Sequence, residues 1–307
     1  MLKPSRIVGA GLSGLLAAYA WPGIPILESS PTSGAEHQAL LRFRSDAVSR
    51  LTGIPFRRVT VRKGVWSRGW FQSPSIALAN MYSMKVLGRI VSDRSIWNLE
   101  PVERFIAPDD FYGQLVDNAG DRIQWGKPDD FEHGQLSPII STAPLPIVMA
   151  AVDLPPVETV RAAITVLRFR VPKADVFQTV YFPDRFLPIY RASMTGDTLI
   201  IERTGEKSFA ITEQEADAIR DAFDIFMGEC VPVGIANQKY GKIVPLPDDV
   251  RKAILFRLTH EYGIYSLGRF AQWRNILLDD VINDIDVVKR LLQTGDKYDI
   301  ALTRAGD

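Results

Sequence analysis

A glycine-rich turn near the N-terminus constrains the fold more than any other feature of this chain. Residues 9–14 read Gly-Ala-Gly-Leu-Ser-Gly, a GxGxxG pattern, and an apolar segment, residues 6–9, leads into it. An Ala- and Leu-rich segment, residues 12–21, predicts a helix that stops at a Pro-Gly pair, and residues 24–28 predict a second apolar strand. Strand, turn, helix and strand form a βαβ unit, which requires a parallel sheet.

The three glycines of the turn have separate tasks in binding a dinucleotide. Gly9 permits the tight turn, Gly11 lets a pyrophosphate approach the backbone, and Gly14 lets the helix pack closely on the sheet. The free amides at the positive end of the helix then face the phosphate charge. The predicted phosphate contacts are Gly9, Ala10, Gly11, Leu12, Ser13 and Gly14.

An acidic residue follows at the end of the second predicted strand. Glu28 lies 19 residues after Gly9. A carboxylate at this place accepts hydrogen bonds from the ribose hydroxyls, and it would repel the 2′-phosphate of NADP. We therefore expect Glu28 and its neighbour Ser29 at the ribose of NAD or FAD, between which the turn itself does not discriminate.

The composition is that of an ordinary globular chain. Its 307 residues are 46% hydrophobic and 23% charged, with a formal net charge of zero, so a full core can be buried and the global charge names no partner. The single cysteine, Cys230, excludes an internal disulfide, favours a reducing compartment and is expected to be a buried apolar residue. No apolar stretch of about 18 residues occurs, and glycines interrupt the N-terminal apolar run. We expect a cytoplasmic protein without a membrane partner.

The rest of the chain contains β-prone segments and two clear helices. Strands are predicted for residues 59–61, 123–125, 139–142, 159–171, 179–182 and 198–202. Thr212 and Glu215 form a capping box that begins a helix ending at Met227, and residues 279–292 predict the last helix. The predicted class is α/β, with a Rossmann-like dinucleotide-binding domain interrupted by a smaller antiparallel-sheet (α+β) substrate domain. The first domain is assigned residues 1–45, 100–150 and 255–307, and the second residues 46–99 and 151–254.

Basic residues are concentrated between His37 and Ser92. Ten arginines and lysines face one acid, Asp46, and six aromatic residues are interleaved with them. Charge and stacking surfaces in this combination suit a diphosphate, a nucleotide or a nucleic acid strand, and acids from elsewhere in the fold could equally balance the charge.

Three stretches resemble the flavin-containing amine oxidase superfamily, which includes protoporphyrinogen oxidase and UDP-galactopyranose mutase. They are residues 7–15, Ile-Val-Gly-Ala-Gly-Leu-Ser-Gly-Leu; residues 139–146, Ile-Ile-Ser-Thr-Ala-Pro-Leu-Pro; and residues 263–273, Gly-Ile-Tyr-Ser-Leu-Gly-Arg-Phe-Ala-Gln-Trp, with Asp-Asp-Val at 279–281. A fourth stretch, residues 181–202, resembles that superfamily's substrate-domain strands. The resemblance covers about half of the chain and implies FAD as the cofactor.

The resemblance implies cofactor contacts from separate parts of the chain. Arg269 would lie beside the pyrophosphate, and residues 275–279 would lie near the flavin ring, where a helix N-terminus stabilises negative charge on the reduced ring. The superfamily has a basic residue and a Gly-Gly pair after the ribose-binding glutamate, whereas this chain has Ser-Ser-Pro-Thr-Ser-Gly, so Arg42 or Arg44 is expected to replace the phosphate contact. The contacts implied outside the turn are Arg44, Thr142, Ala143, Gly268, Arg269, Asn275 and Leu278.

These features lead to one main hypothesis, an FAD-dependent oxidoreductase of the amine-oxidase type that acts on an anionic substrate, including nucleotide-containing ones. The flavin N5 would accept a hydride from a carbon beside nitrogen or oxygen, so no protein acid or base is required and no catalytic residue is assigned. Arg191 is predicted to clamp a carboxylate or phosphate of the substrate, because a guanidinium binds either in a bidentate manner. Tyr181, Tyr190 and Trp273 are predicted to line the substrate pocket.

Three alternatives stay open. The first is a non-redox flavoenzyme similar to UDP-galactopyranose mutase, in which Arg191 and Arg269 would flank a nucleotide diphosphate. The second is a flavoenzyme that modifies a nucleic acid base, and the third is a non-catalytic FAD-binding subunit. One cysteine and three scattered histidines (His37, His133 and His260) give no metal-ligand spacing, so no metal is expected. The oligomeric state is not predicted.

Overall fold

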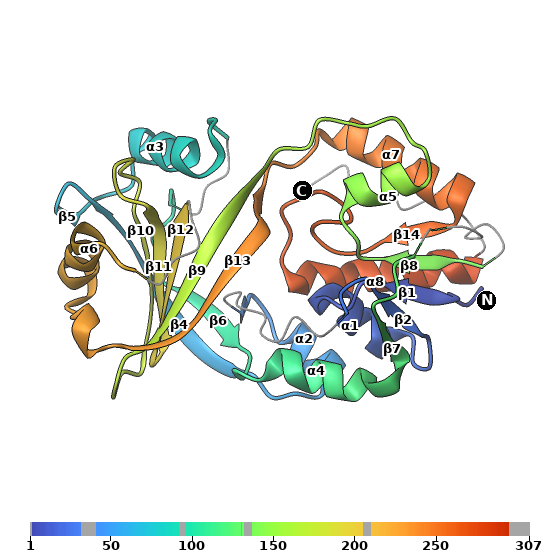
Figure 1. Ribbon diagram of the computed structural model, residues 1–307, viewed down its shortest axis with the longest axis horizontal. Coiled ribbons are helices and arrows are strands. Elements are labelled where there is room, and N and C mark those ends of the chain that lie inside the picture. The colour runs from blue at the N-terminus through green and yellow to red at the C-terminus, as the bar shows by residue number, and fades with distance from the viewer. Residues whose placement is uncertain are drawn as a thin grey trace.

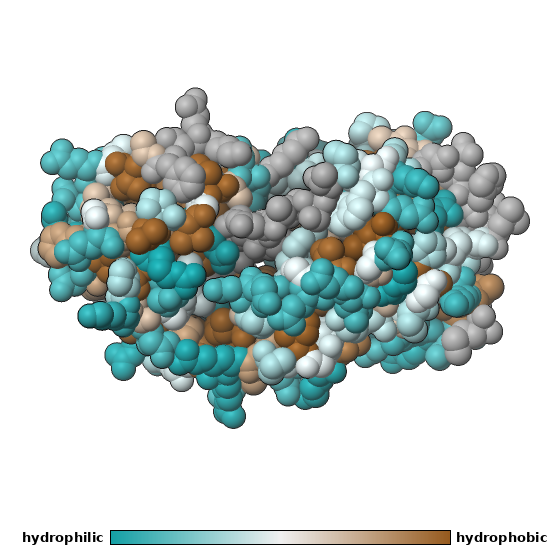
Figure 2. Space-filling view, turned by 60° about the horizontal axis from the view of Figure 1, so that its bottom comes forward, coloured by the Kyte–Doolittle hydropathy of each residue, from teal (hydrophilic) through white to brown (hydrophobic). Residues whose placement is uncertain are grey.

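The computed structural model has two sheets that lie side by side, each with its own helices (Figure 1). The structure describes residues 2–31, 41–91, 96–129, 131, 137–204 and 210–294. His37, His133 and the segment after Tyr298 lie outside these described residues. Apolar and hydrophilic patches alternate over both halves of the surface (Figure 2).

The smaller sheet is entirely parallel, with the strand order β14-β8-β1-β2-β7. Helix α1 (Leu12–Ala20) connects β1 to β2, as the glycine pattern predicts. All five strands run the same way, so their carboxyl ends meet at one edge, where ligands bind in open α/β sheets. The strands are β1 (Arg6–Val8), β2 (Ile26–Glu28), β7 (Ile123–Trp125), β8 (Ile139–Ser141) and β14 (Ile264–Ser266).

Helices cover both faces of this sheet. On one face Ile7, Ile140 and Tyr265 pack into a core with α1, α4 and α8. On the other face Ile139 and Ile264 pack against α5 and α7. These helices are α4 (Phe111–Ala119), α5 (Leu145–Ala151), α7 (Asp248–Tyr262) and α8 (Leu278–Thr294), and the short helices α2 (Ala47–Thr52) and η1 (Gly120–Arg122) complete this half.

The larger sheet has nine strands, eight of them in the order β13-β9-β12-β11-β10-β4-β6-β3, with β5 paired to β4. Most pairs are antiparallel, as predicted, but β10 and β4 are parallel, so the sheet is mixed. Its strands are β3 (Arg42–Phe43), β4 (Arg57–Ser67), β5 (Trp70–Phe71), β6 (Val102–Ile106), β9 (Arg161–Arg170), β10 (Val176–Tyr181), β11 (Ile189–Gly196), β12 (Thr198–Thr204) and β13 (Val231–Ile243).

Each face of the larger sheet carries its own core. Helix α6 (Glu213–Phe223) covers one face through Ile219 and Ala222, followed by the short helix η2 (Met227–Glu229). Cys230 belongs to this core with an exposed fraction of 9%, so it is the buried apolar residue that we expected. Helix α3 (Ile76–Leu87) covers part of the opposite face through Tyr82 and Val86.

The larger sheet curls, as the contacts of one side chain demonstrate. Arg42 of β3 donates to Thr179 of β10 (2.7 Å, Nη1 to Oγ1) and to Thr195 of β11 (2.6 Å, Nη2 to Oγ1). Strands β6 and β4 separate β3 from β10 in the sheet. A side chain reaches across two intervening strands only when the sheet bends towards it, so this face is concave.

The predicted fold class is confirmed, and several details differ from the expectation. The second sheet has more strands than the first, and β3 and β6 join it although both fall inside the ranges assigned to the dinucleotide-binding domain. The domain boundaries therefore stay a prediction. The capping box of Thr212 and Glu215 is confirmed, and α6 ends at Phe223 rather than Met227 because Asp224 adopts a left-handed conformation (φ 55°).

Candidate functional site

The glycine-rich turn is packed so tightly that two of its glycines cannot be replaced. A Cβ on Gly14 would stand 1.9 Å from the carbonyl oxygen of Gly9, and a Cβ on Gly9 (φ +98°) would stand 2.4 Å from Thr142 Oγ1. The Thr142 hydroxyl donates to the carbonyl of Val8 (2.9 Å). Thr142 is therefore a structural partner of the turn at the end of β8, with Ala143 directly after it.

Gly11 differs from its neighbours because space is open around it. Nothing lies within 4 Å of a Cβ built on Gly11. Gly11 is the N-cap of α1, and among the described residues no side chain caps this helix and no acid lies in its first turn. The amides at the start of α1, which include Leu12 and Ser13, are thus available to an anion that approaches Gly11.

Glu28 is held in position beside the turn. Its Oε2 accepts from the Ala10 amide (2.8 Å), and its Oε1 accepts from the Ser30 amide (2.9 Å) and the Ser29 hydroxyl (3.3 Å). The carboxylate is thereby fixed at the end of β2, where the sequence predicts a ribose contact. Ser29 is brought to the same place, and here it bonds to Glu28.

A residue that the sequence analysis did not single out supports the turn from α4. The Tyr112 hydroxyl donates to the Ala10 carbonyl (3.1 Å). Burial raises the pKa of Tyr112, and nearby Glu28 adds to the rise. Tyr112 therefore stays a neutral donor at physiological pH. It carries no local sequence signal, because the contact depends on how α4 packs against α1.

The C-terminal Gly-Arg segment lies directly on the turn. Gly268 has φ +91°, and a Cβ there would stand 2.4 Å from Ser13 Oγ and 2.8 Å from Ser13 Cβ. The Leu267 amide donates to the Ser141 carbonyl (2.8 Å), which fixes the segment to β8. The next residue, Arg269, is half-buried, and its Nη2 contacts Asn275 Oδ1 at 3.4 Å. The structure thus brings together the two ends of the chain that the resemblance assigned to one cofactor.

The start of α8 is tied to the segment that carries Arg44. The Asp279 carboxylate accepts from the amides of Arg44 and Ser45 (both 3.0 Å) and from the Ser45 hydroxyl (2.8 Å). Arg44 Nη1 lies 3.8 Å from the carboxylate of Asp280. Arg44 therefore lies beside the first turn of α8, which begins at Leu278. Asp279 is the organising residue at this point, with an exposed fraction of 8%.

Three of the residues predicted to bind substrate, Arg191, Tyr190 and Tyr181, lie in the larger sheet, whereas Trp273 is buried in the core on the α5–α7 face of the parallel sheet. Arg191 and Glu202 pair across β11 and β12, with Nη2 to Oε1 at 2.7 Å, and Glu202 also accepts from the Tyr190 hydroxyl at 3.0 Å. Although burial opposes it, Arg191 lowers the pKa of Glu202, so the pair is ionised. Tyr190 and Trp273 have no exposed surface, and Tyr181 has 5%. Their substrate roles stay predictions, and Arg191 already has a carboxylate partner.

Two other guanidinium groups lie on the concave face without a carboxylate among the described residues. Arg42 bonds to hydroxyls of β10 and β11, and Arg104 donates to the carbonyl of Glu103 (2.6 Å). Burial and repulsion from Arg191 lower the pKa of Arg42 to about 9. Burial and repulsion from Arg44 likewise lower the pKa of Arg104. Both remain cationic at neutral pH, so the concave face carries positive charge in excess of the Arg191–Glu202 pair.

Part of the basic run between His37 and Ser92 pairs with acids from elsewhere in the fold, including Arg44 with Asp280. Arg57 pairs with Asp175 (2.9 Å), and Arg58 pairs with Glu103. Lys63 and Lys85 donate to backbone carbonyls. The basic run is therefore partly offset by acids, and the nucleic acid alternative stays a prediction.

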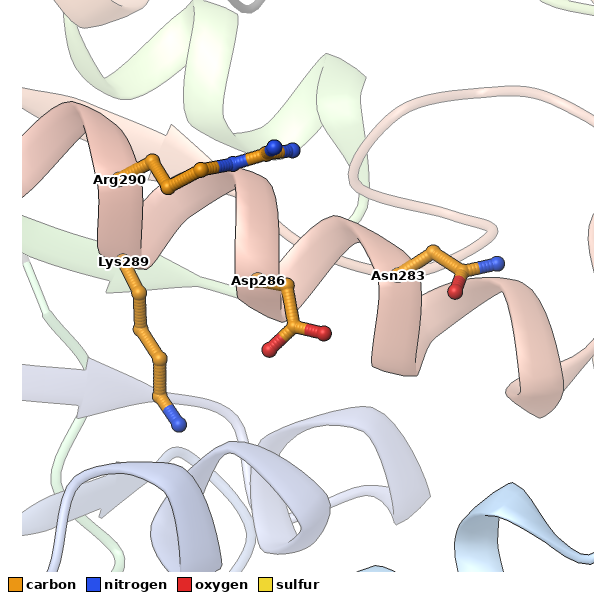
Figure 3. Close-up of a pocket in the computed structure, with 4 residues that line it drawn as sticks. All are labelled: Asn283, Asp286, Lys289 and Arg290. Atoms are coloured by element: carbon orange, nitrogen blue, oxygen red, sulfur yellow. The ribbon is translucent and has the colours of Figure 1, made fainter.

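The hollow in Figure 3 lies away from the residues above. It is a pocket of about 420 Å³ along α8, lined by Asn283, Asp286, Lys289 and Arg290, and Asp286 and Lys289 project from one side of the helix. None of the predicted site residues lines it. Within the described residues there is no group of acids, histidines and cysteines that could hold a metal ion. Nor is any described helix long and apolar enough to cross a membrane.

The fold and the turn define the class: this is the fold of the Rossmann-type FAD-binding flavoproteins that are similar to amine oxidases. The crystal structure of reduced UDP-galactopyranose mutase matches with a TM-score of 0.67 at 14% identity, over 96% of this chain and 95% of that chain. Glycine oxidase from Geobacillus kaustophilus matches with a TM-score of 0.55 at 10% identity, over 96% of this chain and 95% of that chain. The fatty acid isomerase of P. acnes matches with a TM-score of 0.54 at 12% identity, over 93% of this chain and 97% of that chain. No protein-family profile and no curated protein sequence matches the chain. At these identities the likeness establishes the fold, which is the one that the sequence resemblance implied.

Proposed function

We propose that this protein binds FAD and is an FAD-dependent oxidoreductase of the amine-oxidase type that acts on an anionic small molecule. The observation that carries the proposal is the contact between Gly268 and Ser13 over the phosphate-binding turn. It places a Gly-Arg segment, a bare helix N-terminus and the Glu28 carboxylate around one site, and this set of groups suits a dinucleotide. The three structural neighbours support the same assignment through their fold.

The residues present fit each part of FAD. Open space at Gly11 and the uncapped amides of α1 suit the pyrophosphate, and Arg269 lies next to the Gly268 segment to add a cation. Glu28 suits the ribose hydroxyls. The start of α8, where Asp279 holds the amides of Arg44 and Ser45, is the proposed place for the pyrimidine end of the flavin. When bound, the flavin supplies hydride acceptance, and the protein orients the substrate and excludes water.

The concave face of the larger sheet is the proposed place for the negative charge of the substrate. Arg42 and Arg104 lie on this face without an ionic partner in the described part of the chain. Arg191, in contrast, already holds the carboxylate of Glu202. We therefore transfer the role of substrate clamp from Arg191 to Arg104, with Arg42 adding charge from behind, and leave Arg191 as the residue that neutralises Glu202.

The proposal is tested by the cofactor content of a matched pair of variants. Gly11 and Gly228 both have open space around a built Cβ and neither has a positive φ. Gly11→Asp places a side chain and a negative charge against the pyrophosphate, so the purified protein should lose its yellow chromophore. Gly228→Asp adds the same group at η2 and should keep it. A colourless wild-type protein that takes up no FAD on reconstitution, or a Gly11→Asp variant with full FAD content, would refute the proposal.

A second candidate is a flavoenzyme without net redox change. Its support is the fold likeness to reduced UDP-galactopyranose mutase, which covers the same shares of both chains as the likeness to glycine oxidase. Activity that appears only after dithionite reduction and consumes no electrons would support this candidate. Bleaching of the flavin by substrate, with recovery in air, would support the oxidoreductase.

A further inference from the structure

Two serines stand side by side at the carboxyl edge of the parallel sheet. Ser141 ends β8 and Ser266 ends β14, and the two residues are in register across this pair of strands. Side chains that are in register in a sheet project from the same face. The exposed fraction is 0% for Ser141 and 5% for Ser266, so both hydroxyls are shielded from bulk water.

Neither hydroxyl has a hydrogen-bond partner in the part of the chain that the structure describes. The backbone carbonyls of the same two residues already accept bonds, Ser141 from the Leu267 amide (2.8 Å) and Ser266 from the Gln272 side chain (3.0 Å). A buried hydroxyl without a partner costs about as much as a lost hydrogen bond, and nearly all buried polar groups are satisfied by protein or by ordered water. The two hydroxyls therefore indicate a small bound ligand.

The face from which the two serines project is otherwise apolar. Two residues earlier in the same strands, Ile139 and Ile264 are in register and pack against α5 and α7. Alternate residues of a strand share a face, so each serine follows an isoleucine on this side of the sheet. Because each serine is smaller than the isoleucine before it, the change provides volume for a molecule of the size of water.

A third buried donor belongs to the same core. Trp273 has no exposed surface, packs in the cluster that contains Ile139 and Ile264, and its indole Nε1 also has no hydrogen-bond partner among the described residues. The bond from Gln272 to the Ser266 carbonyl holds this segment against the end of β14. An indole N–H only donates, whereas a hydroxyl donates and accepts, so these three groups match the two donors and two acceptors of one water molecule.

We propose that Ser141, Ser266 and Trp273 bind one ordered water molecule between β8 and β14. Buried waters in globular proteins typically make about three hydrogen bonds to groups that would otherwise be unsatisfied. Here the water accepts from the indole N–H and bridges the two hydroxyls, and such a bridge is nearly as favourable in enthalpy as a direct hydrogen bond.

Two other small ligands fit this site less well. A cation needs charged acceptors, and the described residues contain no group of acids, histidines and cysteines that could hold a metal ion. An anion among the apolar side chains of this core would lose its hydration, and three neutral donors offset little of that cost. Water is neutral and can both donate and accept, so it satisfies all three groups.

The water would lie next to the proposed cofactor site. Thr142 directly follows Ser141 and contacts the glycine-rich turn, and Gly268 comes two residues after Ser266. A water shared by the two strands would fix the spacing of these segments. This positioning role rests on the proposed function, whereas the water site itself can be tested whether or not the protein binds FAD.

The test is the sign of the stability change when serine is replaced by alanine. With the water bound, Ser141→Ala and Ser266→Ala each remove one of its hydrogen bonds, and each should raise the equilibrium constant of unfolding about fivefold in urea titrations. The double variant should raise it by less than the product of the single effects, because both hydroxyls act through one water. Hydroxyls that were simply unsatisfied would give the opposite sign, since alanine would remove a buried polar group without a partner.

Ser83→Ala is the matched control. Ser83 is also fully buried, but its hydroxyl has direct partners, the Arg89 carbonyl and the Val91 amide (both 2.9 Å). Its effect should combine independently with that of Ser266→Ala, because Ser83 lies in α3 on the larger sheet. A high-resolution crystal structure of the wild-type protein should show a water within hydrogen-bond distance of both serine oxygens and of the Trp273 indole nitrogen.

Three results would overturn the proposal. The first is wild-type electron density in which the two hydroxyls bond directly to protein groups, with no water between them. The second is a gain of stability in either single variant. The third is a double variant whose effect equals the product of the two single effects, as Ser83→Ala with Ser266→Ala should show. A colourless protein that passes these tests would refute the proposed function and leave the water site intact.

Discussion

The backbone of Gly268 rests on the side chain of Ser13, close enough that a Cβ would stand 2.4 Å from the serine hydroxyl oxygen. Ser13 belongs to the glycine-rich turn, and Gly268 belongs to the segment that follows β14. The left-handed conformation of Gly268 (φ +91°) makes this approach feasible only for glycine. The proposed cofactor site is therefore closed by a contact between two small residues.

Gly268→Ala should weaken FAD retention and destabilise the fold by about 2 kcal/mol, because the new methyl group meets Ser13 and the backbone is strained. Ser13→Gly removes both atoms of the clash, so the double variant should regain part of the loss and keep only the strain. FAD-to-protein ratios from absorption spectra, with melting temperatures, measure both effects. Full FAD retention in Gly268→Ala alone would contradict the placement of this segment.

Arg191→Met should cost about 3 kcal/mol of unfolding free energy, because it leaves the buried Glu202 carboxylate without its cation. Arg104→Met should cost less than about 1 kcal/mol, since within the described residues Arg104 bonds to a backbone carbonyl and to no carboxylate. The effects on substrate binding should have the opposite order. Arg104→Met should raise the KM for an anionic substrate more than Arg191→Met does. Urea denaturation and steady-state kinetics separate the two. Equal losses of stability would remove the distinction on which the proposed substrate clamp depends.

Lys85 predicts a pH dependence of stability. Its ammonium group donates to the carbonyls of Phe182 (2.7 Å) and Ile189, and burial lowers its pKa from 10.5 to about 7. Between pH 7 and pH 10.5 the unfolded chain therefore binds more protons than the folded one, so this group makes stability rise with pH, and below pH 7 its contribution is constant. The rise between pH 7 and about pH 9 should amount to roughly 2 kcal/mol after allowance for partial exposure. In urea titrations at a series of pH values, Lys85→Met should flatten the dependence of the unfolding free energy on pH. An unchanged pH dependence would show that other groups cause it.

Tyr112→Phe isolates the support that α4 gives to the turn. The variant removes one hydrogen bond to the Ala10 carbonyl and nothing from the aromatic packing, so stability should fall by about 1 kcal/mol. FAD dissociation should become severalfold faster. Tyr262→Phe in α7 is a suitable control, since Tyr262 belongs to the opposite face of the parallel sheet. Identical dissociation rates for the two variants would show that Tyr112 does not position the turn.

The parts of the site that sequence reasoning predicted are those where backbone geometry admits one residue type. Gly9 and Gly14 are required by contacts of 2.4 Å and 1.9 Å, and Glu28 follows because it ends the next strand of the same βαβ unit. Helix α6 could be bounded at its start because Thr212 and Glu215 cap it within four residues of chain. Each of these signals is local, so no knowledge of the tertiary fold is needed to interpret it.

The parts that escaped prediction depend on contacts between distant segments. Helix α7 does not separate apolar from polar residues, because the charged Arg251 lies on its buried side with 7% exposure. The sequence pattern therefore does not predict this helix. Arg42 was one of two candidates, with Arg44, for a phosphate contact, and its reach to Thr179 and Thr195 follows only from the curl of the sheet. Asp279 organises Arg44 and Ser45 across most of the chain's length. None of these relationships leaves a pattern in a short window of sequence.

The contact between Ser13 and Gly268 also determines when, during synthesis, the chain can first complete the proposed cofactor site. During synthesis the glycine-rich turn is made before β14, Gly268 and α8, because Gly268 follows Ser13 by 255 residues. A nascent or truncated chain that stops before them has the phosphate-binding amides without their cover. Such a chain would expose the edge of the parallel sheet to chaperones and proteases, so uptake of the proposed cofactor would require that synthesis has passed α8.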